Sequence, residues 1–331
     1  MAEVKPKIMI VSYAAGGAEV LSSWIKLNKP EEELLFCLDG PAIQIFSNKL
    51  GDIQRVSIEK ISYFDPNVDK VIASTGWSPD FERRAIEEAQ KKNIYNITII
   101  DHWKNYRERY LPSGLWKEIP NNWQSYLSNE VWVCDKYAYN LALELGFPPH
   151  YMKQIENPYL QDFKEKYTKK SKINKVDNHN NIRVLFISEP ISQHYAKKYN
   201  DSNYLGYTEY DLVESLIDAF KKAQNLNVEI ELKLRLHPSE PKEKYSNIIK
   251  ESCLFEVSEN QDMLHDLIWT DAVVGSDSMA LVLSLAVGKP VFSVIPPTSK
   301  KDCSIPYKGI RHKQSFLEVI NDLVRAKGED K

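Results

Sequence analysis

The chain has 331 residues, of which 43% are hydrophobic and 27% charged, and its formal net charge at pH 7 is −3. This composition is that of a soluble globular protein, and the small negative charge gives no support for bulk binding to nucleic acid or to an acidic membrane surface. The length exceeds that of a typical single domain, so the sequence predicts two domains.

The amino terminus and the cysteines bear on the cellular compartment. The first residues lead directly into an apolar strand, without the long apolar core and cleavage site of a signal peptide. Cys37, Cys134, Cys253 and Cys303 are far apart and form no CxxC pair, which argues against a zinc knuckle or a disulfide framework. We expect a cytoplasmic protein, and peripheral association with the inner face of the membrane stays open.

The first half of the chain alternates strand-like and helix-like segments. Short apolar runs predict strands over residues 7–13, 33–40, 70–76, 95–101 and 129–135. Amphipathic runs predict helices over 16–27, 41–51, 78–93 and 136–146. The third helix would open with a Ser78 cap and Pro79 in its first turn. This alternation indicates βαβ units and a parallel sheet.

The second half repeats the alternation after a change of composition. Residues 158–181 are polar and rich in Lys and Asn, which predicts a linker. Predicted strands then cover 182–190, 228–238, 271–278 and 290–295, and predicted helices cover 207–224, 262–270, 279–288 and 315–326.

The predicted fold is α/β, of the GT-B type, with two Rossmann-like, doubly wound domains that face each other across a cleft. The domains would span residues 1–157 and 182–331, and the last helix has room to pack back on the first domain. Ligands of open α/β sheets bind beyond the carboxyl ends of the strands. Candidate functional residues are therefore those that directly follow a strand.

Two strand ends of the first half carry such residues. Gly16 and Gly17 follow the first strand and let the backbone turn tightly into a helix, either as a simple turn or as a binding loop. Asp101 follows the strand at 95–101 and precedes His102, a pair that suits acid–base chemistry on a sugar-like hydroxyl. The alternative for Asp101 is a cap or a salt bridge to Arg107.

Acidic residues occur at two places in the second half. Glu189 ends the strand at 182–190, and Glu209 and Asp211 stand at the start of the helix at 207–224. Each is a candidate general base. An acidic residue in the first helical turn also caps the helix and complements its dipole, which is the alternative for the pair.

Two further strand ends suit an anionic ligand. Arg235 and His237 lie at positions i and i+2 of a strand that stops at Pro238, so they share one side of it and could neutralise or protonate a phosphate. The alternative is that Pro238 merely ends the strand.

Gly275, Ser276 and Ser278 form a strand-to-helix turn whose N–H and hydroxyl groups can hold an anion, or in which a serine only caps the helix.

The stretches "LKLRLHPSE" and "VVGSDSMALVLSLAVGKPVFSV" are similar to a known family of sequences. Together with "LFISEPIS" and "GYTEYDLVESLIDAF" they resemble the nucleotide-sugar domain of GT-B glycosyltransferases. The nearest likeness is to bacterial sialyltransferases and polysialyltransferases, and to Kdo transferases of capsule and lipopolysaccharide assembly. It covers about half of the chain, roughly residues 130–300.

The resemblance implies transfer of a 2-keto sugar acid from a CMP donor to a bacterial surface-glycan or glycolipid acceptor. It implies no metal and no cofactor, and no nucleic-acid partner. His237 would act in catalysis with a carboxylate, either Glu209 or Asp101, while Asp211 and Glu189 stay alternative bases because the acidic motif of polysialyltransferases is absent. The implied donor-binding residues are Glu189, Arg235, His237, Pro238, Gly275, Ser276 and Ser278.

Two other functions fit the same residues. One keeps the fold and changes the chemistry, to a UDP-sugar epimerase or hydrolase or to a CDP-polyol phosphotransferase. The other is a non-catalytic nucleotide- or sugar-binding partner in a glycan assembly complex. Nucleotide preference separates the first from CMP-sugar transfer, and substitution of the carboxylates separates both enzymes from a binding partner.

Overall fold

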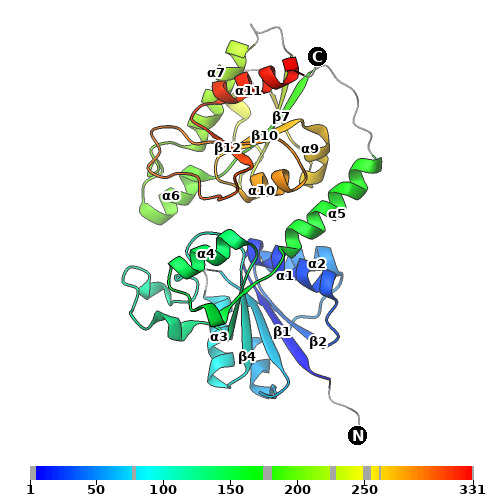
Figure 1. The fold of residues 1–331 in the computed structure, drawn as a ribbon, viewed down its shortest axis with the longest axis vertical. Coiled ribbons are helices and arrows are strands. Elements are labelled where there is room, and N and C mark those ends of the chain that lie inside the picture. Colours follow the sequence, from blue (N-terminus) through cyan, green and yellow to red (C-terminus); the bar gives the residue numbers. More distant parts are fainter. Residues whose placement is uncertain are drawn as a thin grey trace. The chain divides into compact units, whose positions relative to one another are not determined.

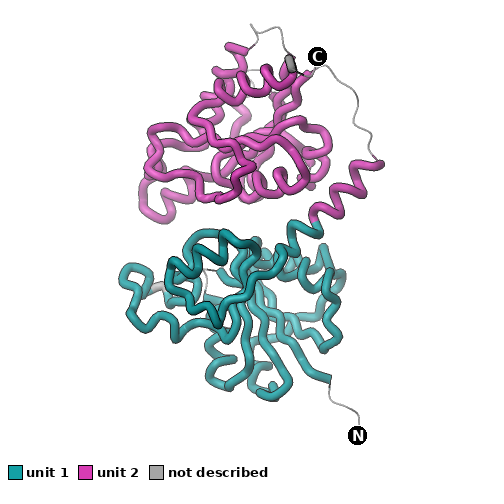
Figure 2. Tube along the Cα trace, viewed as in Figure 1, with its two compact units in different colours: residues 1–162 teal, residues 163–331 magenta. Residues whose placement is uncertain are grey.

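The computed structural model describes residues 5–76, 80–173, 181–223, 229–248, 255–260 and 262–329. The chain forms two compact units, residues 1–162 and 163–331 (Figure 2). Each unit is a parallel sheet with helices on both faces (Figure 1). Among the described helices, none combines the length and the apolarity needed to cross a lipid bilayer.

The sheet of the first unit has six parallel strands in the order β2-β1-β3-β4-β5-β6. The strands are β1 (Lys7–Ser12), β2 (Glu33–Leu38), β3 (Lys70–Ser74), β4 (Tyr95–Ile100), β5 (Glu130–Val133) and β6 (Met152–Gln154). Strand β2 forms the edge of the sheet, and a single parallel bridge joins its Phe36 to Arg55. The strand order reverses between β1 and β3.

Helices cover both faces of this sheet because its central strands are apolar on both sides. In β1, Ile8 and Ile10 belong to the core under α1 and α2, whereas Met9 and Val11 belong to the core under α3. Side chains of a strand point alternately to its two faces, so a continuous apolar run is what a doubly covered strand requires. The helices are α1 (Ala15–Asn28), α2 (Pro41–Leu50), α3 (Phe81–Lys91) and α4 (Lys136–Glu144).

The sheet of the second unit also has six parallel strands, in the order β12-β11-β10-β7-β8-β9. They are β7 (Ile182–Ile187), β8 (Ile230–Arg235), β9 (Phe255–Val257), β10 (Ala272–Gly275), β11 (Val291–Val294) and β12 (Ile310–Lys313). The chain runs outward from β7 to β9 and then continues on the other side of β7 at β10. The order therefore reverses between β7 and β10.

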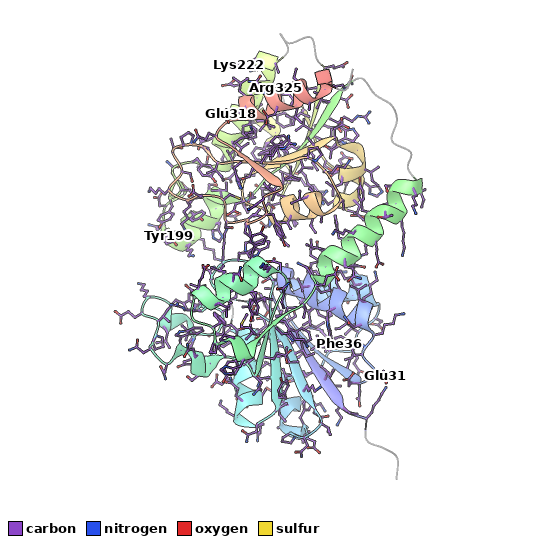
Figure 3. All side chains as sticks on the ribbon, in the orientation of Figure 1. Glu31, Phe36, Tyr199, Lys222, Glu318 and Arg325 are labelled. Atoms are coloured by element: carbon purple, nitrogen blue, oxygen red, sulfur yellow. The ribbon has the colours of Figure 1, made fainter. Side chains whose placement is uncertain are left out.

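One core of the second unit joins this sheet to α7 (Glu209–Ala223) and α11 (Phe316–Glu329). The fully buried rings of Phe186 and Phe316 meet edge to face at 5.7 Å. The last helix, α11, packs against α7 and β12 of its own unit. The polar sides of α11 and α7 face solvent. Glu318 on α11 and Lys222 on α7 are exposed, and both are labelled in Figure 3. Further described helices of this unit are α6 (Ile191–Tyr199), α9 (Met263–Trp269) and α10 (Met279–Ala286).

The predicted α/β class with two Rossmann-like units is confirmed by these two sheets. The sequence did not predict the strands β6, β9 and β12, which have only three or four residues each. It also did not predict α6. Such short elements carry too few residues for a periodic pattern to show.

The predicted linker at 158–181 begins with a helix, α5 (Pro158–Ile173). The Asn157 side chain caps this helix by accepting hydrogen bonds from the N–H groups of Tyr159 and Leu160, at 3.0 and 3.2 Å. The helix was missed because its surface is almost entirely polar. The two units divide within α5, between residues 162 and 163.

The start of α3 and the cysteines can also be compared with the sequence analysis. Helix α3 begins at Phe81 with Asp80 at its N-cap, later than predicted, and the proposed Ser78 cap lies outside the described residues. Cys37 and Cys134 are buried free thiols, and Cys303 is a half-buried one. Cys253 lies outside the described residues.

Candidate functional site

The carboxyl ends of β7 and β10 lie side by side at the reversal of the second sheet. Glu189, just after β7, accepts hydrogen bonds at Oε1 from Ser276 Oγ at 2.5 Å and from the Asp277 N–H at 2.8 Å. Two residues predicted from sequence, Glu189 and Ser276, are thus brought into direct contact. A reversal of strand order leaves an opening between the loops on either side of it, which is where open α/β sheets bind ligands.

The neighbouring residues of the β10 turn have structural partners. Ser278 is the N-cap of α10, and its Oγ accepts the Ala280 N–H at 3.3 Å. A Cβ on Gly275 would come within 3.3 Å of the Ile187 backbone oxygen, so a glycine lets β10 lie close to β7. The alternatives of cap and close packing therefore account for Ser278 and Gly275.

Two residues at this site were not singled out from the sequence. Asp277 accepts hydrogen bonds from the Ser304 N–H at 2.9 Å and from Ser304 Oγ at 2.8 Å. Tyr207 is buried, and its burial, together with the nearby carboxylates of Glu189 and Asp277, raises the pKa of its phenol well above the ordinary range. The available signal for Asp277 was its place between two predicted serines.

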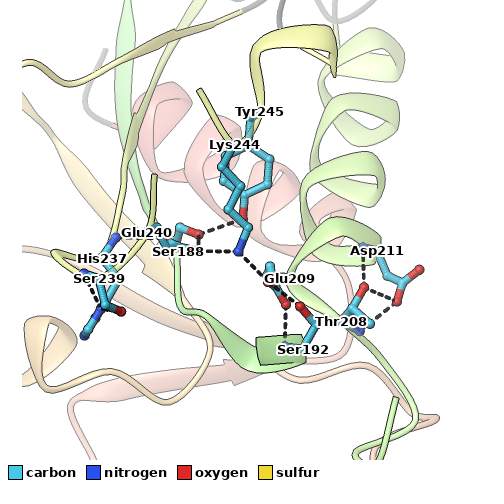
Figure 4. Close-up of polar contacts among 10 residues, drawn as sticks. All are labelled: Ser188, Ser192, Thr208, Glu209, Asp211, His237, Ser239, Glu240, Lys244 and Tyr245. Carbon is cyan, nitrogen blue, oxygen red and sulfur yellow. Dashed lines mark hydrogen bonds and ion pairs between the residues drawn. The ribbon is translucent and has the colours of Figure 1, made fainter. Parts of the chain in front are cut away.

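The next strand, β8, delivers His237 in a tight turn. The His237 N–H donates to Glu240 Oε2 at 2.7 Å, and the Glu240 N–H donates back to the His237 carbonyl at 2.8 Å. The imidazole Nδ1 lies 2.7 Å from Ser239 Oγ (Figure 4). Desolvation by the surrounding residues lowers the pKa of His237 below that of a free histidine, which favours the neutral imidazole at pH 7.

Arg235 has a different role from the one predicted for it. Its guanidinium donates to Asp266, a fully buried carboxylate on α9, at 2.7 Å, and to the Asn260 carbonyl at 2.8 Å. The guanidinium is therefore occupied in joining β8 to α9. Alternation along a strand places Arg235 and His237 on one side only while the strand continues, and β8 ends at Arg235.

The acidic pair at the start of α7 separates into two structural roles. Asp211 Oδ2 accepts hydrogen bonds from the Thr208 N–H and Oγ, at 2.7 and 2.8 Å, which closes a capping box. Glu209 is only 1% exposed; it accepts from the Ser192 N–H and Oγ, each at 2.7 Å, and from Lys244. Burial alone would raise the pKa of Glu209, but the hydrogen bonds from Lys244 and Ser192 lower it. These contacts favour a supporting role for Glu209.

In the first unit, Asp101 follows β4 and is held by an arginine. Its Oδ1 accepts from Arg109 Nη1 at 2.6 Å, and the same nitrogen donates to the Thr75 carbonyl at 2.6 Å. The salt bridge considered from sequence, to Arg107, is wrong. Arg107 instead donates to the Leu145 carbonyl at 2.8 Å. In an irregular loop, sequence distance does not tell which of two arginines folds back.

Gly16 and Gly17 allow α1 to pack closely on the strand ends. A Cβ on Gly16 would lie 2.0 Å from Asp101 Oδ2, and one on Gly17 would lie 2.5 Å from the Ser74 Cβ. Carboxylates surround the start of this helix, because Glu82 Oε1 accepts the N–H groups of Tyr13 and Ala14 at 2.9 and 3.2 Å. The carboxylates make this loop poorly suited to an anionic ligand, and the close packing accounts for both glycines as parts of a tight turn.

Glu82 is the most unusual acidic residue of this region. It is 2% exposed, and Oε2 is buried without a hydrogen-bond partner in the described part of the chain. Burial raises the pKa of Glu82, although hydrogen bonds from Tyr13, Ala14 and Ser74 act in the opposite direction. No sequence pattern distinguishes Glu82 from the other glutamates of α3.

One cavity of the first unit lies at the other end of the sheet. Its volume is about 580 Å³. Its lining includes residues at the amino ends of strands, such as Ile8, Lys70 and Tyr95, together with Trp24 and Trp132. We do not assign the candidate site to this cavity, because functional groups of parallel sheets gather at the carboxyl ends. Within the described ranges, no group of three or more acidic, histidine or cysteine side chains could hold a metal ion.

Comparison with known proteins finds the fold and no sequence family. No family model matches the chain, and no curated protein does. A structure of S. aureus MnaA with UDP matches 96% of this chain and 88% of its own, with 11% identity and a TM-score of 0.62. UDP-GlcNAc 2-epimerase from Neisseria meningitidis bound to UDP-GlcNAc covers 96% and 91%, with 13% identity and a TM-score of 0.62. Anabaena HepE in complex with UDP covers 96% and 90%, with 13% identity and a TM-score of 0.59.

These comparisons correct the resemblance inferred from sequence. The matching structures include UDP-GlcNAc 2-epimerases from several organisms, and they point away from sialyltransferases and Kdo transferases. The predictions of CMP-sugar transfer and of a sialyltransferase-like enzyme were wrong. They rested on motifs of two to four residues at strand ends that meet a phosphate, and a phosphate is common to CMP, CDP and UDP.

The close approach of Gly16 to Asp101 predicts the effect of a single methyl group. Gly16→Ala should lower the free energy of unfolding by about 1–3 kcal/mol, because either the Asp101–Arg109 pair or the start of α1 must move. Urea unfolding measures the change. Gly114→Ala is the matched control, since a Cβ there meets nothing within 4 Å. Equal stability of the two variants would contradict the packing described.

The buried carboxyl of Glu82 predicts a pH-dependent stability. Its pKa is raised from 4.5 in the folded chain, so its contribution to stability is full below the unfolded pKa and is lost as pH rises through the folded pKa. Glu82→Gln should therefore become more stable relative to wild type between about pH 4.5 and pH 8. Urea unfolding at both pH values tests this. Glu87→Gln, on the exposed side of the same helix, should show no such gain, because the pKa of Glu87 is lowered by Lys91.

Proposed function

We propose that the protein is a UDP-sugar enzyme, an epimerase or a hydrolase, whose second unit binds the nucleotide at the strand ends of β7, β8 and β10. The observation that carries the proposal is the group formed there by Glu189, Asp277 and the neutral ring of His237. This group offers a nucleotide sugar two kinds of hydrogen-bond partner. The carboxylates would accept hydrogen bonds from hydroxyl groups, and the imidazole N–H would donate one to a phosphate.

The ligands of the similar structures support this choice of nucleotide. The named structures of S. aureus MnaA and Anabaena HepE hold UDP, and that of the N. meningitidis enzyme holds UDP-GlcNAc. Another structure of HepE holds UDP-glucose. Since their two-unit fold extends over nearly the whole of this chain, we carry the class of ligand over to it as a proposal.

Each residue of the site has a distinct role in this function. A ribose or sugar hydroxyl would donate to Glu189 or Asp277. His237 would donate an N–H to a diphosphate oxygen and stabilise the charge that builds up when the sugar–diphosphate bond breaks. Acid–base chemistry on the sugar requires a further carboxylate. We assign it to Asp101 of the first unit, because Asp101 directly follows β4 and Arg109 holds its Oδ1 in a fixed place.

Binding of UDP provides the first test. UDP at about 100 times its dissociation constant should raise the melting temperature by roughly 5 °C or more, whereas CMP and CDP at the same concentration should have a smaller effect. His237→Ala should lose most of the UDP shift. His312→Ala, at an exposed position of the opposite edge strand β12, should keep it.

The alternatives predict other patterns. A larger shift with CDP than with UDP would favour the phosphotransferase, and a shift with CMP alone would contradict the proposed nucleotide. Equal shifts in wild type and His237→Ala would remove His237 from the site.

The role of Asp101 is tested by turnover. Asp101→Asn should reduce conversion of UDP-GlcNAc or UDP-glucose, followed by ¹H NMR, by about 100-fold or more, because the amide cannot accept a proton. The UDP shift in melting temperature should remain. Asp39→Asn is the control, since Asp39 also directly follows a strand of the same sheet and accepts a hydrogen bond from the neighbouring Gly40 N–H. Full activity of Asp101→Asn would exclude it as the base.

A further inference from the structure

The turn that carries His237 is held by Glu240. Two hydrogen bonds close it: the His237 N–H donates to Glu240 Oε2, and the Glu240 N–H donates to the His237 carbonyl. The Glu240 side chain has no exposed surface. A buried carboxylate is stable only if both of its oxygens have hydrogen-bond or ionic partners. The partners of Oε1 therefore show which other residues the turn is joined to.

That other oxygen connects the turn with the neighbouring strand. Glu240 Oε1 accepts hydrogen bonds from Ser188 Oγ at 3.0 Å and from Lys244 Nζ at 2.6 Å (Figure 4). Ser188 directly precedes Glu189 at the end of β7, and it also contacts the buried hydroxyl of Tyr245 at 2.8 Å. The loops that present Glu189 and His237 are therefore joined through one carboxylate.

Lys244 extends the connection to the start of α6. Its ammonium pairs with Glu209 as well as Glu240, and Glu209 in turn accepts the two donors of Ser192. Lys244, Glu209 and Glu240 have side chains that are at most 7% exposed. Three buried charges that satisfy each other hold both loops in a single arrangement.

Ser239 determines the state of the imidazole itself. The Ser239 N–H lies 3.2 Å from His237 Nδ1, and its hydroxyl lies 2.7 Å from the same atom. A backbone N–H can only donate, so Nδ1 must accept, and the proton of the neutral ring must be on Nε2. His237 is exposed, which leaves Nε2–H available for a ligand.

From this geometry we infer that Ser239 and Glu240 are positioning residues for His237. Ser239 selects the Nε2–H tautomer, and Glu240, anchored on Lys244, fixes the place of the ring, so that one N–H is presented to a phosphate oxygen. The inference rests on the proposed function in one respect only, the identity of the acceptor as the diphosphate of UDP. The tautomer and its cause can be observed in the free protein.

The first part of the test uses no ligand. Long-range ¹H–¹⁵N spectra of protein labelled at histidine nitrogens report which ring nitrogen carries the proton. At about pH 8, wild type should show His237 as the Nε2–H tautomer, because the lowered pKa leaves the ring neutral there. The signal is assigned from its absence in His237→Ala. Ser239→Ala keeps the N–H that donates to Nδ1 and loses only the hydroxyl, so it should shift the tautomer ratio partly towards Nδ1–H. Ser239→Thr, which keeps a hydroxyl, should restore the ratio.

The second part measures UDP affinity by calorimetry in the same variants. Ser239→Ala should weaken binding about threefold to tenfold, the effect of one hydrogen bond, and Ser239→Thr should recover most of the loss. Ser246→Ala is the control in the same segment. Glu240→Gln should weaken binding by about tenfold or more because its amide cannot pair with Lys244. Ser239 is exposed, so its variants remain informative if Glu240→Gln fails to fold.

The outcomes separate the inference from the proposed function. An Nδ1–H tautomer in wild type, or identical tautomer ratios and affinities in wild type and Ser239→Ala, would overturn the positioning role. The expected tautomer pattern without any binding of UDP would uphold the control of the ring by Ser239, overturn the diphosphate as its acceptor and reject the UDP-sugar function.

Discussion

The second unit depends on one buried cation. Lys244 lies between Glu209 and Glu240, and each of these charges would cost several kcal/mol to bury alone. In contact with one another, the three charges compensate the cost of burial. The two carboxylates also bind the loops around them. Glu209 binds Ser192 at the start of α6, and Glu240 binds the turn of His237. The loops that follow β7 and β8 are therefore held by the same buried ion pairs of Lys244.

The candidate residues of both units lie near the point where the order of strands reverses, but the groups differ. In the first unit the reversal lies between β1 and β3, and the carboxylates Asp101 and Glu82 surround the start of α1. In the second it lies between β7 and β10, with a histidine in the turn after the adjacent strand β8. Carboxylates near a helix start suit the handling of protons and hydroxyl groups, whereas an N–H donor suits a phosphate. The same architecture thus provides two chemically different surfaces, one in each unit.

The sequence predicted the long elements and several strand-end residues well, for a physical reason. Buried parallel strands need continuous apolar runs and their ends need turns, so Glu189, Ser276 and His237 could be placed without coordinates. The predictions that failed concerned side-chain contacts, which depend on how the loops fold in space. Arg109 rather than Arg107 reaches Asp101, and Arg235 turns to the buried Asp266. The nucleotide could not be predicted from an HP or serine motif, because a phosphate is common to all the nucleotides considered, whereas UDP and CMP differ in the base and in the number of phosphates. Glu240 and Lys244 were missed because an ordinary charged segment hides which of its members are buried.

The edge of the first sheet has a consequence for the behaviour of the chain in solution. Strand β2 has one neighbour, β1, and on its outer side the described residues provide only the bridge from Phe36 to Arg55. An open edge of this kind invites pairing with a strand from another molecule. Three consecutive glutamates, residues 31–33, precede the apolar part of the strand, and Glu31 and Glu33 are exposed. Glu31 is labelled in Figure 3. Charges at this position keep the edge hydrated and make extension of the sheet by a second chain unfavourable, which opposes β-sheet aggregation through the unpaired strand.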